Sequence, residues 1–266
     1  MSHRIDALAH GNRLRLLPPL HKAGFAATLL LLALVAPMPV QVLIGLWLAL
    51  WVVGYAGIPA GTYLAMLLLP LGFAVSSLPA IVISAVGQDG LAGLQADAWR
   101  GLSQPVAGWT LSISNHGLSQ ASALLTRSLA ATSALFFLLL TTPFSEWIQV
   151  LRRLRVPPLL LELMVHVYGF IFTLWAIVDE IAVAQRARSG HSNWRRTLHS
   201  LGLLIGQLLE RSLASYRGRA LALEARGFQG ELRVVSCASH RASRRYLAEA
   251  IGGCAVLGAL SIAWQR

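Results

Sequence analysis

The stretch from Asp179 to Gly227 is rich in arginine within an otherwise apolar chain, and it contains AQRARSG at residues 184–190 and ALEARG at residues 222–227. Apolar residues recur at helical spacing before each of these short sequences, so each predicts the end of a helix. Arg188 and Arg226 then fall in last helical turns, where unpaired carbonyl groups favour a cation. We expect Gly190 and Gly227 to supply the left-handed conformation that stops each helix. One such sequence alone is typical of an ordinary helix end, but its repetition indicates a shared function.

The composition is that of an integral membrane protein. Of 266 residues, 56% are hydrophobic and 12% are charged, and Ala23 to Gln88 contains no Asp, Glu, Lys or Arg. A transmembrane helix needs about 20 apolar residues, so this interval has room for three. The predicted spans are residues 23–36, 40–55, 62–86 (kinked at Pro70 and Pro79), 118–140 and 246–264. The sequence therefore predicts an all-α integral membrane protein with about five transmembrane helices.

Long amphipathic helices are expected between the fourth and last spans. Residues 143–155 predict a short amphipathic helix, Pro158 to Arg188 one long helix, and Ser192-Asn193 to Arg226 a second. Basic residues flank residues 159–178 on both sides, and basic loops are cytoplasmic as a rule. We therefore expect this segment to slant through the inner leaflet rather than cross, with the N-terminus and the long helices cytoplasmic.

These patterns divide the chain into three parts. Residues 1–142 form an N-terminal part with four transmembrane helices, and residues 143–232 form a cytoplasmic or inner-leaflet region of coupling helices. Residues 233–266 form a basic linker and a C-terminal transmembrane helix.

Several classes of function are disfavoured by what the sequence lacks. The net charge is +11, yet the chain has a single lysine, Lys22, in His-Lys-Ala. A phosphate-binding loop needs Gly-Lys-Ser/Thr, so the chain has no ATP site of that kind. The basic residues gather beside spans, which favours membrane orientation over nucleic-acid binding. No hydrolase or metalloprotease motif is present, and the eight histidines are mostly scattered. We predict no catalytic residue, no cofactor, no metal site and no enzyme activity.

Four short sequences together resemble the transmembrane T component of energy-coupling factor (ECF) transporters, the EcfT/CbiQ family. They are TTPF at 141–144, LRVP at 154–157, AQRAR at 184–188 and ALEARGF at 222–228. The N-terminal pattern of Ile5-Asp6, NRLR at 12–15, Pro19 and Lys22 is similar to the cobalt branch, CbiQ. The resemblance covers nearly the whole chain. The first signature departs from it by reading Ala-Arg-Ser, with its glycine displaced to Gly190.

The resemblance implies an energy-coupling scaffold of an ATP-driven Co²⁺ uptake transporter in the bacterial inner membrane. The implied partners are two copies of an ATP-binding cassette ATPase subunit, a CbiM-like substrate-binding membrane subunit (S component), a small CbiN-like membrane subunit and membrane lipid, without nucleic acid. The residues that it implies for ATPase coupling are Ala187, Arg188, Ser189, Ala225, Arg226 and Gly227.

Three alternatives remain open from the sequence. A T component for nickel or a vitamin would share this scaffold, and a membrane-anchored receptor or assembly factor is a further possibility. A stand-alone secondary transporter or channel would favour internal repeats and ionisable residues lining a path within the membrane. Only Arg127, Glu162 and His166 fit that description. Arg127 lies inside the fourth predicted span, where it is costly against lipid, so we expect it to face protein or water.

Overall fold

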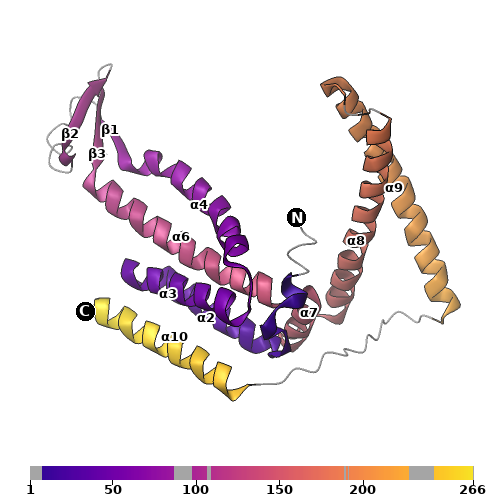
Figure 1. The fold of residues 1–266 in the computed structure, drawn as a ribbon, viewed down its shortest axis with the longest axis horizontal. Coiled ribbons are helices and arrows are strands. Elements are labelled where there is room, and N and C mark those ends of the chain that lie inside the picture. The colour runs from indigo at the N-terminus through magenta and orange to yellow at the C-terminus, as the bar shows by residue number, and fades with distance from the viewer. Residues whose placement is uncertain are drawn as a thin grey trace. The chain divides into compact units, whose positions relative to one another are not determined.

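The computed structural model describes residues 8–86, 98–106, 109–188, 190, 192–227 and 243–265. Its elements are the 3₁₀-helix η1 (Arg13–Leu16), α2 (Pro19–Val35), α3 (Met38–Leu50), the π-helix η2 (Trp51–Tyr55), α4 (Ala60–Val82), β1 (Ile83–Val86), β2 (Ala98–Val106), β3 (Trp109–Ser114), α6 (Asn115–Thr141), α7 (Phe144–Arg153), α8 (Pro158–Ala187), α9 (Trp194–Ala225) and α10 (Arg244–Gln265) (Figure 1). The chain forms two compact units, Met1–Trp147 with Ala238–Arg266, and Ile148–Cys237. The three-part division expected from the sequence stays a prediction.

The helical membrane fold is confirmed. Among the residues that the structure describes, five helices are long and apolar enough to cross a membrane: Met38–Tyr55, Ala60–Val82, Asn115–Thr141, Pro158–Ala187 and Arg244–Trp264. This set differs from the predicted one, because it includes α8 and leaves out α2, an apolar helix of 17 residues. At about 1.5 Å per residue, α2 covers about 25 Å of a hydrocarbon core that is about 30 Å thick. That α8 does not cross fully stays a prediction.

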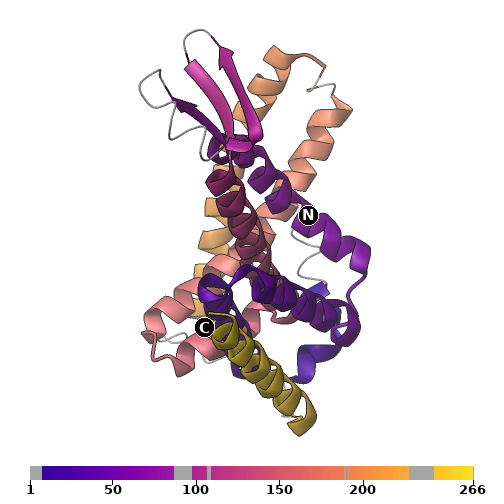
Figure 2. The same cartoon turned by 90° about the vertical axis from the view of Figure 1, so that its left-hand side faces the viewer.

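A small antiparallel sheet joins α4 to α6, with strand order β1-β3-β2 (Figure 2). The sequence predicts a third span that extends to Val86 and no strand between it and the fourth span, so the sheet was not predicted. A short apolar run such as Ile83–Val86 fits a strand as well as a helix end. α6 begins directly after the sheet, and the Ser114 hydroxyl accepts from the Gly117 amide at 2.9 Å. A Cβ on Gly117 would lie 2.6 Å from the Ile81 carbonyl oxygen, so α4 and α6 can meet here only at glycine.

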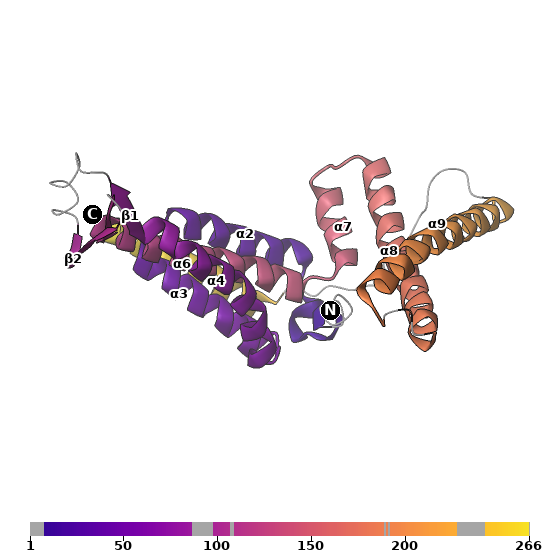
Figure 3. The same ribbon diagram turned by 90° about the horizontal axis from the view of Figure 1, so that it is seen from above.

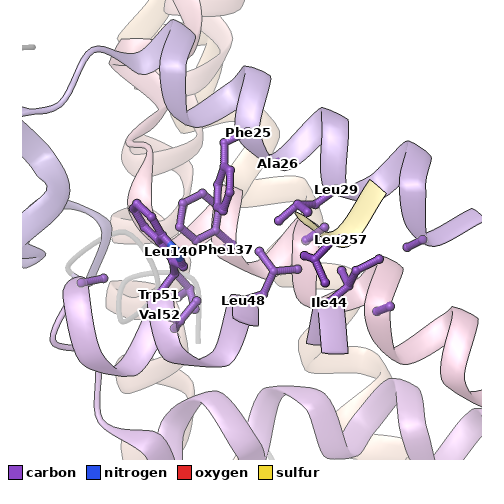
Figure 4. Close-up of a cluster of buried hydrophobic side chains, with 14 of the residues drawn as sticks. Phe25, Ala26, Leu29, Ile44, Leu48, Trp51, Val52, Phe137, Leu140 and Leu257 are labelled. Carbon is purple, nitrogen blue, oxygen red and sulfur yellow. The ribbon is translucent and has the colours of Figure 1, made fainter. Parts of the chain in front are cut away.

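The core of the first unit lies where α2, α3, η2, α6 and α10 meet (Figures 3 and 4). The Phe25 ring packs 4.9 Å from Trp51 and 5.4 Å from Phe137, measured between ring centroids. Leu257 of α10 is buried in the same cluster. A Cβ on Gly253 would lie 2.8 Å from the Trp47 ring, so α10 can approach α3 only through glycine at this position. The last predicted span is therefore packed on the first unit.

A buried polar cluster satisfies the C-terminal end of α6. Asn12 Nδ2 donates to the Leu140 carbonyl at 3.2 Å, and Lys22 Nζ donates to the Thr141 carbonyl at 2.9 Å. Lys22 also forms a 2.7 Å ion pair with Glu146, and both side chains are buried. Carbonyl groups at a helix end lack intrahelical partners. The side chains of Asn12 and Lys22 supply the hydrogen-bond donors that these carbonyls need. The cluster joins two stretches that carried the family resemblance, residues 12–22 and residues 141–144.

Candidate functional site

The second unit is dominated by α8 and α9, which run antiparallel and cross (Figures 1 and 3). Their contacts run in opposite chain order. Gln185 Nε2 donates to the Ser200 carbonyl at 2.7 Å, Arg211 pairs with Glu180 at 2.7 Å, and Arg219 donates to the Thr173 hydroxyl. The helices contain 30 and 32 residues, so each is about 45 Å long or more. The two predicted long helices are confirmed.

The two signature arginines occupy equivalent backbone positions. Arg188 is the C-cap of α8, with φ −97° and ψ 18°, and Arg226 is the C-cap of α9, with φ −92° and ψ 7°. The Arg188 amide donates to the Gln185 carbonyl at 3.2 Å, and the Arg226 amide donates to the Leu223 carbonyl at 3.1 Å. The expectation that each arginine ends a helix is confirmed, although the first signature lacks the usual glycine.

The glycines after the two arginines play different parts. Gly227 has φ +74°, the left-handed conformation that was expected. Gly190 does not adopt a positive φ, so the same expectation is wrong there. A Cβ at Gly190 would lie 2.8 Å from Ser200 Oγ and 2.9 Å from the Gln185 carbonyl oxygen. This glycine is needed for close packing rather than for backbone conformation.

Gln185, Gly190 and Ser200 form a closed set of hydrogen bonds that we call the α8–α9 corner. The Gly190 amide donates to the Gln185 carbonyl at 2.9 Å, and the buried Ser200 hydroxyl donates to the Gly190 carbonyl at 2.9 Å. The Gln185 side chain then bonds the Ser200 carbonyl. The corner fixes the chain just beyond Arg188 to the second turn of α9. Gln185 lies in the AQRAR sequence but was given no role, and Ser200 was not noted, because nothing in helical periodicity marks either contact.

Both arginine ends are exposed. Ala187, Arg188, Ala225, Arg226 and Gly227 are all accessible, and Ser189 lies outside the described residues. Within the described ranges, neither guanidinium group lies in an ion pair. Arg188 follows the last residue of α8 and Arg226 the last residue of α9, so the antiparallel pair places them near opposite ends of α9. Ser200 and Ala225 are about 38 Å apart along the helix axis.

The arrangement is suited to binding protein rather than to chemistry on a small ligand. Two separate cationic helix ends can each contact a partner, but they cannot converge on one substrate. In the part of the chain that the structure describes, no three His, Cys, Asp or Glu side chains gather as a metal site would require. The candidate site is therefore the two exposed arginine ends, which are joined by the pair of helices α8 and α9.

This fold and these ends define a multi-pass helical membrane protein with a pair of long helices that end in exposed arginine caps. The chain belongs to the CbiQ family, described as cobalt transport protein, whose profile matches residues 10–235. It is 34% identical over 233 residues to the cobalt transport protein CbiQ of Rhodobacter capsulatus, with 87% of each chain covered. The predicted family is confirmed.

Two further relatives carry related names. The cobalt transport protein CbiQ of Salmonella typhimurium is 27% identical over 232 residues, which cover 85% of this chain and 97% of the relative. A putative fused cobalt transport protein CbiMQ of Methanocorpusculum labreanum is 25% identical over 236 residues, which cover 86% of this chain and 37% of the relative. The family and these names support a role in cobalt transport.

Proposed function

We propose that this protein is the energy-coupling transmembrane scaffold of an ATP-driven Co²⁺ uptake transporter of the ECF type. It receives motion from two copies of an ATP-binding cassette ATPase and passes it to a CbiM-like substrate-binding membrane subunit, accompanied by a small CbiN-like subunit. The observation that carries the proposal is the pair of exposed arginine C-caps, Arg188 and Arg226, with the same backbone geometry at opposite ends of α9.

The geometry explains how one chain can engage two ATPase copies. Each arginine presents a planar guanidinium group, which matches a carboxylate or a set of carbonyl groups on a partner. The small residues beside it, Ala187 and Ala225, allow a partner surface to approach the helix end. Because α8 and α9 are hydrogen-bonded to each other, a displacement at either end moves the pair.

The proposed membrane orientation rests on the distribution of basic residues. The proposed membrane partner rests on one relative. Basic flanks on both sides of residues 159–178 support a cytoplasmic position for the coupling helices, and the basic residues before the first span support the same for the N-terminus, in a bacterial inner membrane. The name of the fused CbiMQ relative supports a CbiM-like membrane partner.

The proposal is tested with Arg188→Ala, Arg226→Ala and the double variant. If the arginines only cap helices, each replacement costs about 0.3 to 1 kcal/mol of helix stability and leaves transport nearly unchanged. If each is buried against an ATPase, the loss is about 2 to 5 kcal/mol of association, or about 30- to several-thousand-fold in affinity. We expect the second result, measured as ATPase retention on a column and ATP-dependent Co²⁺ uptake in vesicles.

Arg217→Ala is the matched control, because Arg217 is exposed on the same helix. Retention and uptake that persist in the double variant, with normal membrane insertion, would remove the coupling role. Uptake by the chain alone, without ATPase subunits, would favour the stand-alone transporter. Competition by Ni²⁺ or a vitamin for uptake would identify a different cargo for the same scaffold.

A further inference from the structure

Arg127 lies near the middle of α6, a 27-residue helix that is one of the candidate membrane spans. At about 1.5 Å per residue, it is about 18 Å from one end of the helix and about 21 Å from the other. It is the only Asp, Glu, Lys or Arg between residues 115 and 141. A charge at this depth is costly against lipid, and such residues normally pair with another group.

The rotation of α6 is fixed by its packed side. Thr126 donates to the buried Gln41 Oε1 at 2.6 Å, and Gln41 Nε2 donates to the Ala36 carbonyl at 2.9 Å. Ala130, Ala134 and Phe137 continue this side one, two and three turns further, and all three are buried. Successive residues of a helix differ by about 100° in direction, so Arg127 lies at the edge of this packed side, and its own side chain is exposed.

Two leucines within a quarter turn of Arg127 around the helix are also exposed. Arg127 is exposed, and Leu124 and Leu135 on the same side are 46% and 56% exposed. We call Leu124, Arg127 and Leu135 the Arg127 stripe. The described acidic residues of this unit, Glu146 and Glu249, are paired with Lys22 and Arg245. No acidic partner for Arg127 is thus present in the described part of its unit.

We propose that the Arg127 stripe binds a transmembrane helix of the substrate-binding membrane subunit, and that this helix presents a carboxylate to Arg127 near mid-membrane depth. The inference rests on the proposed scaffold role, which requires a membrane partner. Charge complementarity decides the occupant. Lipid tails can cover the leucines of the stripe but offer nothing to a guanidinium group, and lipid phosphates lie at the membrane surface, about 15 Å from the centre of the core.

The experiment uses the full chain, co-expressed with its CbiM-like and ATPase subunits and purified in mild detergent. Arg127→Met removes the charge while keeping an unbranched apolar side chain, and Arg127→Lys keeps the charge. We expect Arg127→Met to weaken retention of the membrane subunit by about 30-fold or more. We expect Arg127→Lys to retain most of it, and ATPase retention to be unchanged in both variants.

Leu135→Met is the matched control on the same stripe, because it changes shape without changing charge. Unchanged retention of the membrane subunit in Arg127→Met would overturn the inference and indicate that water or a lipid headgroup satisfies the arginine. Equal losses in Arg127→Met and Leu135→Met, or loss of all subunits with a lowered unfolding temperature, would also overturn it. Failure of the scaffold proposal is read separately, from ATPase retention in the Arg188 and Arg226 variants.

A charge exchange gives a second, independent readout. Arg127→Glu alone should release the membrane subunit. Combining it with replacement of the partner's mid-membrane Asp or Glu by Arg should restore retention. Failure of every such exchange to restore binding would contradict a direct ion pair.

Discussion

The ion pair between Lys22 and Glu146 shows how a single buried contact holds distant parts of the chain together. Both side chains are nearly inaccessible, and Lys22 also bonds the Thr141 carbonyl. Burying a charge away from water is costly. Loss of either member of such a pair therefore lowers stability, because the other charge stays buried without its partner. Its effect on stability therefore depends on whether one partner or both are replaced.

We predict that Lys22→Met lowers the free energy of unfolding by about 3 to 5 kcal/mol, because it leaves the Glu146 carboxylate buried without its cation. The double variant Lys22→Met/Glu146→Leu should recover much of this loss. Denaturant unfolding of the purified protein in detergent measures both. Arg245→Ala is the control, because it breaks the more exposed Arg245–Glu249 pair and should change stability little. A double variant less stable than Lys22→Met would contradict the argument.

Local residue roles could be read from the sequence, but these long-range contacts could not. Arg188 and Arg226 were placed correctly as helix caps, because a cap depends on the few residues around it. Lys22 was noted as the single lysine and as part of a family pattern, but its ion pair was not predicted, since its partner Glu146 lies 124 positions away. Helical periodicity carries no information about which distant residue fills a buried site.

At the scale of elements, the long helices were predictable and their junctions were not. α8 and α9 have extended periodic patterns and clear breakers at their ends, so their bounds agree with expectation to within a few residues. The sheet between α4 and α6 was missed, because Ile83–Val86 is too short for periodicity to separate strand from helix. The α8–α9 corner was missed because it is made by side chains from two helices.

The α8–α9 corner leads to a prediction about Arg188. If Ser200 positions the chain beyond Arg188, Ser200→Ala should weaken ATPase binding by about 3- to 10-fold, the usual size of one lost hydrogen bond. In a double-mutant cycle, this loss should shrink in the Arg188→Ala background and persist in the Arg226→Ala background. Titration of purified ATPase against each variant is the measurement.

Ser212→Ala is the matched control for Ser200→Ala. Ser212 is also a buried serine of α9, but its hydroxyl donates to the Leu209 carbonyl within the same helix at 2.9 Å. The Ser212→Ala variant should therefore leave ATPase binding unchanged. Equal losses for the two serine variants, or full additivity of Ser200→Ala with Arg188→Ala, would show that the corner does not act through Arg188.

At the scale of the whole molecule, membrane topology depends on α8. Its apolar part is long enough to cross, yet basic residues flank it on both sides. We predict that single cysteines at positions 155 and 195, in a background without Cys237 and Cys254, are both protected from an impermeant thiol reagent applied outside. Permeabilised cells provide the labelling control. Reaction of one position but not the other from outside would mean that α8 crosses the membrane.

The burial of Lys22 also decides which chemical probes can report on this protein. Apart from the terminal amino group, Lys22 carries the only primary amine of the chain, and it is 3% exposed. Acylating reagents and amine-directed crosslinkers will therefore modify partner subunits and leave the body of the folded chain untouched. Acylation of Lys22 becomes a sign that the N-terminal segment has opened, so its rate under native conditions reports local unfolding at a single, chemically unique position.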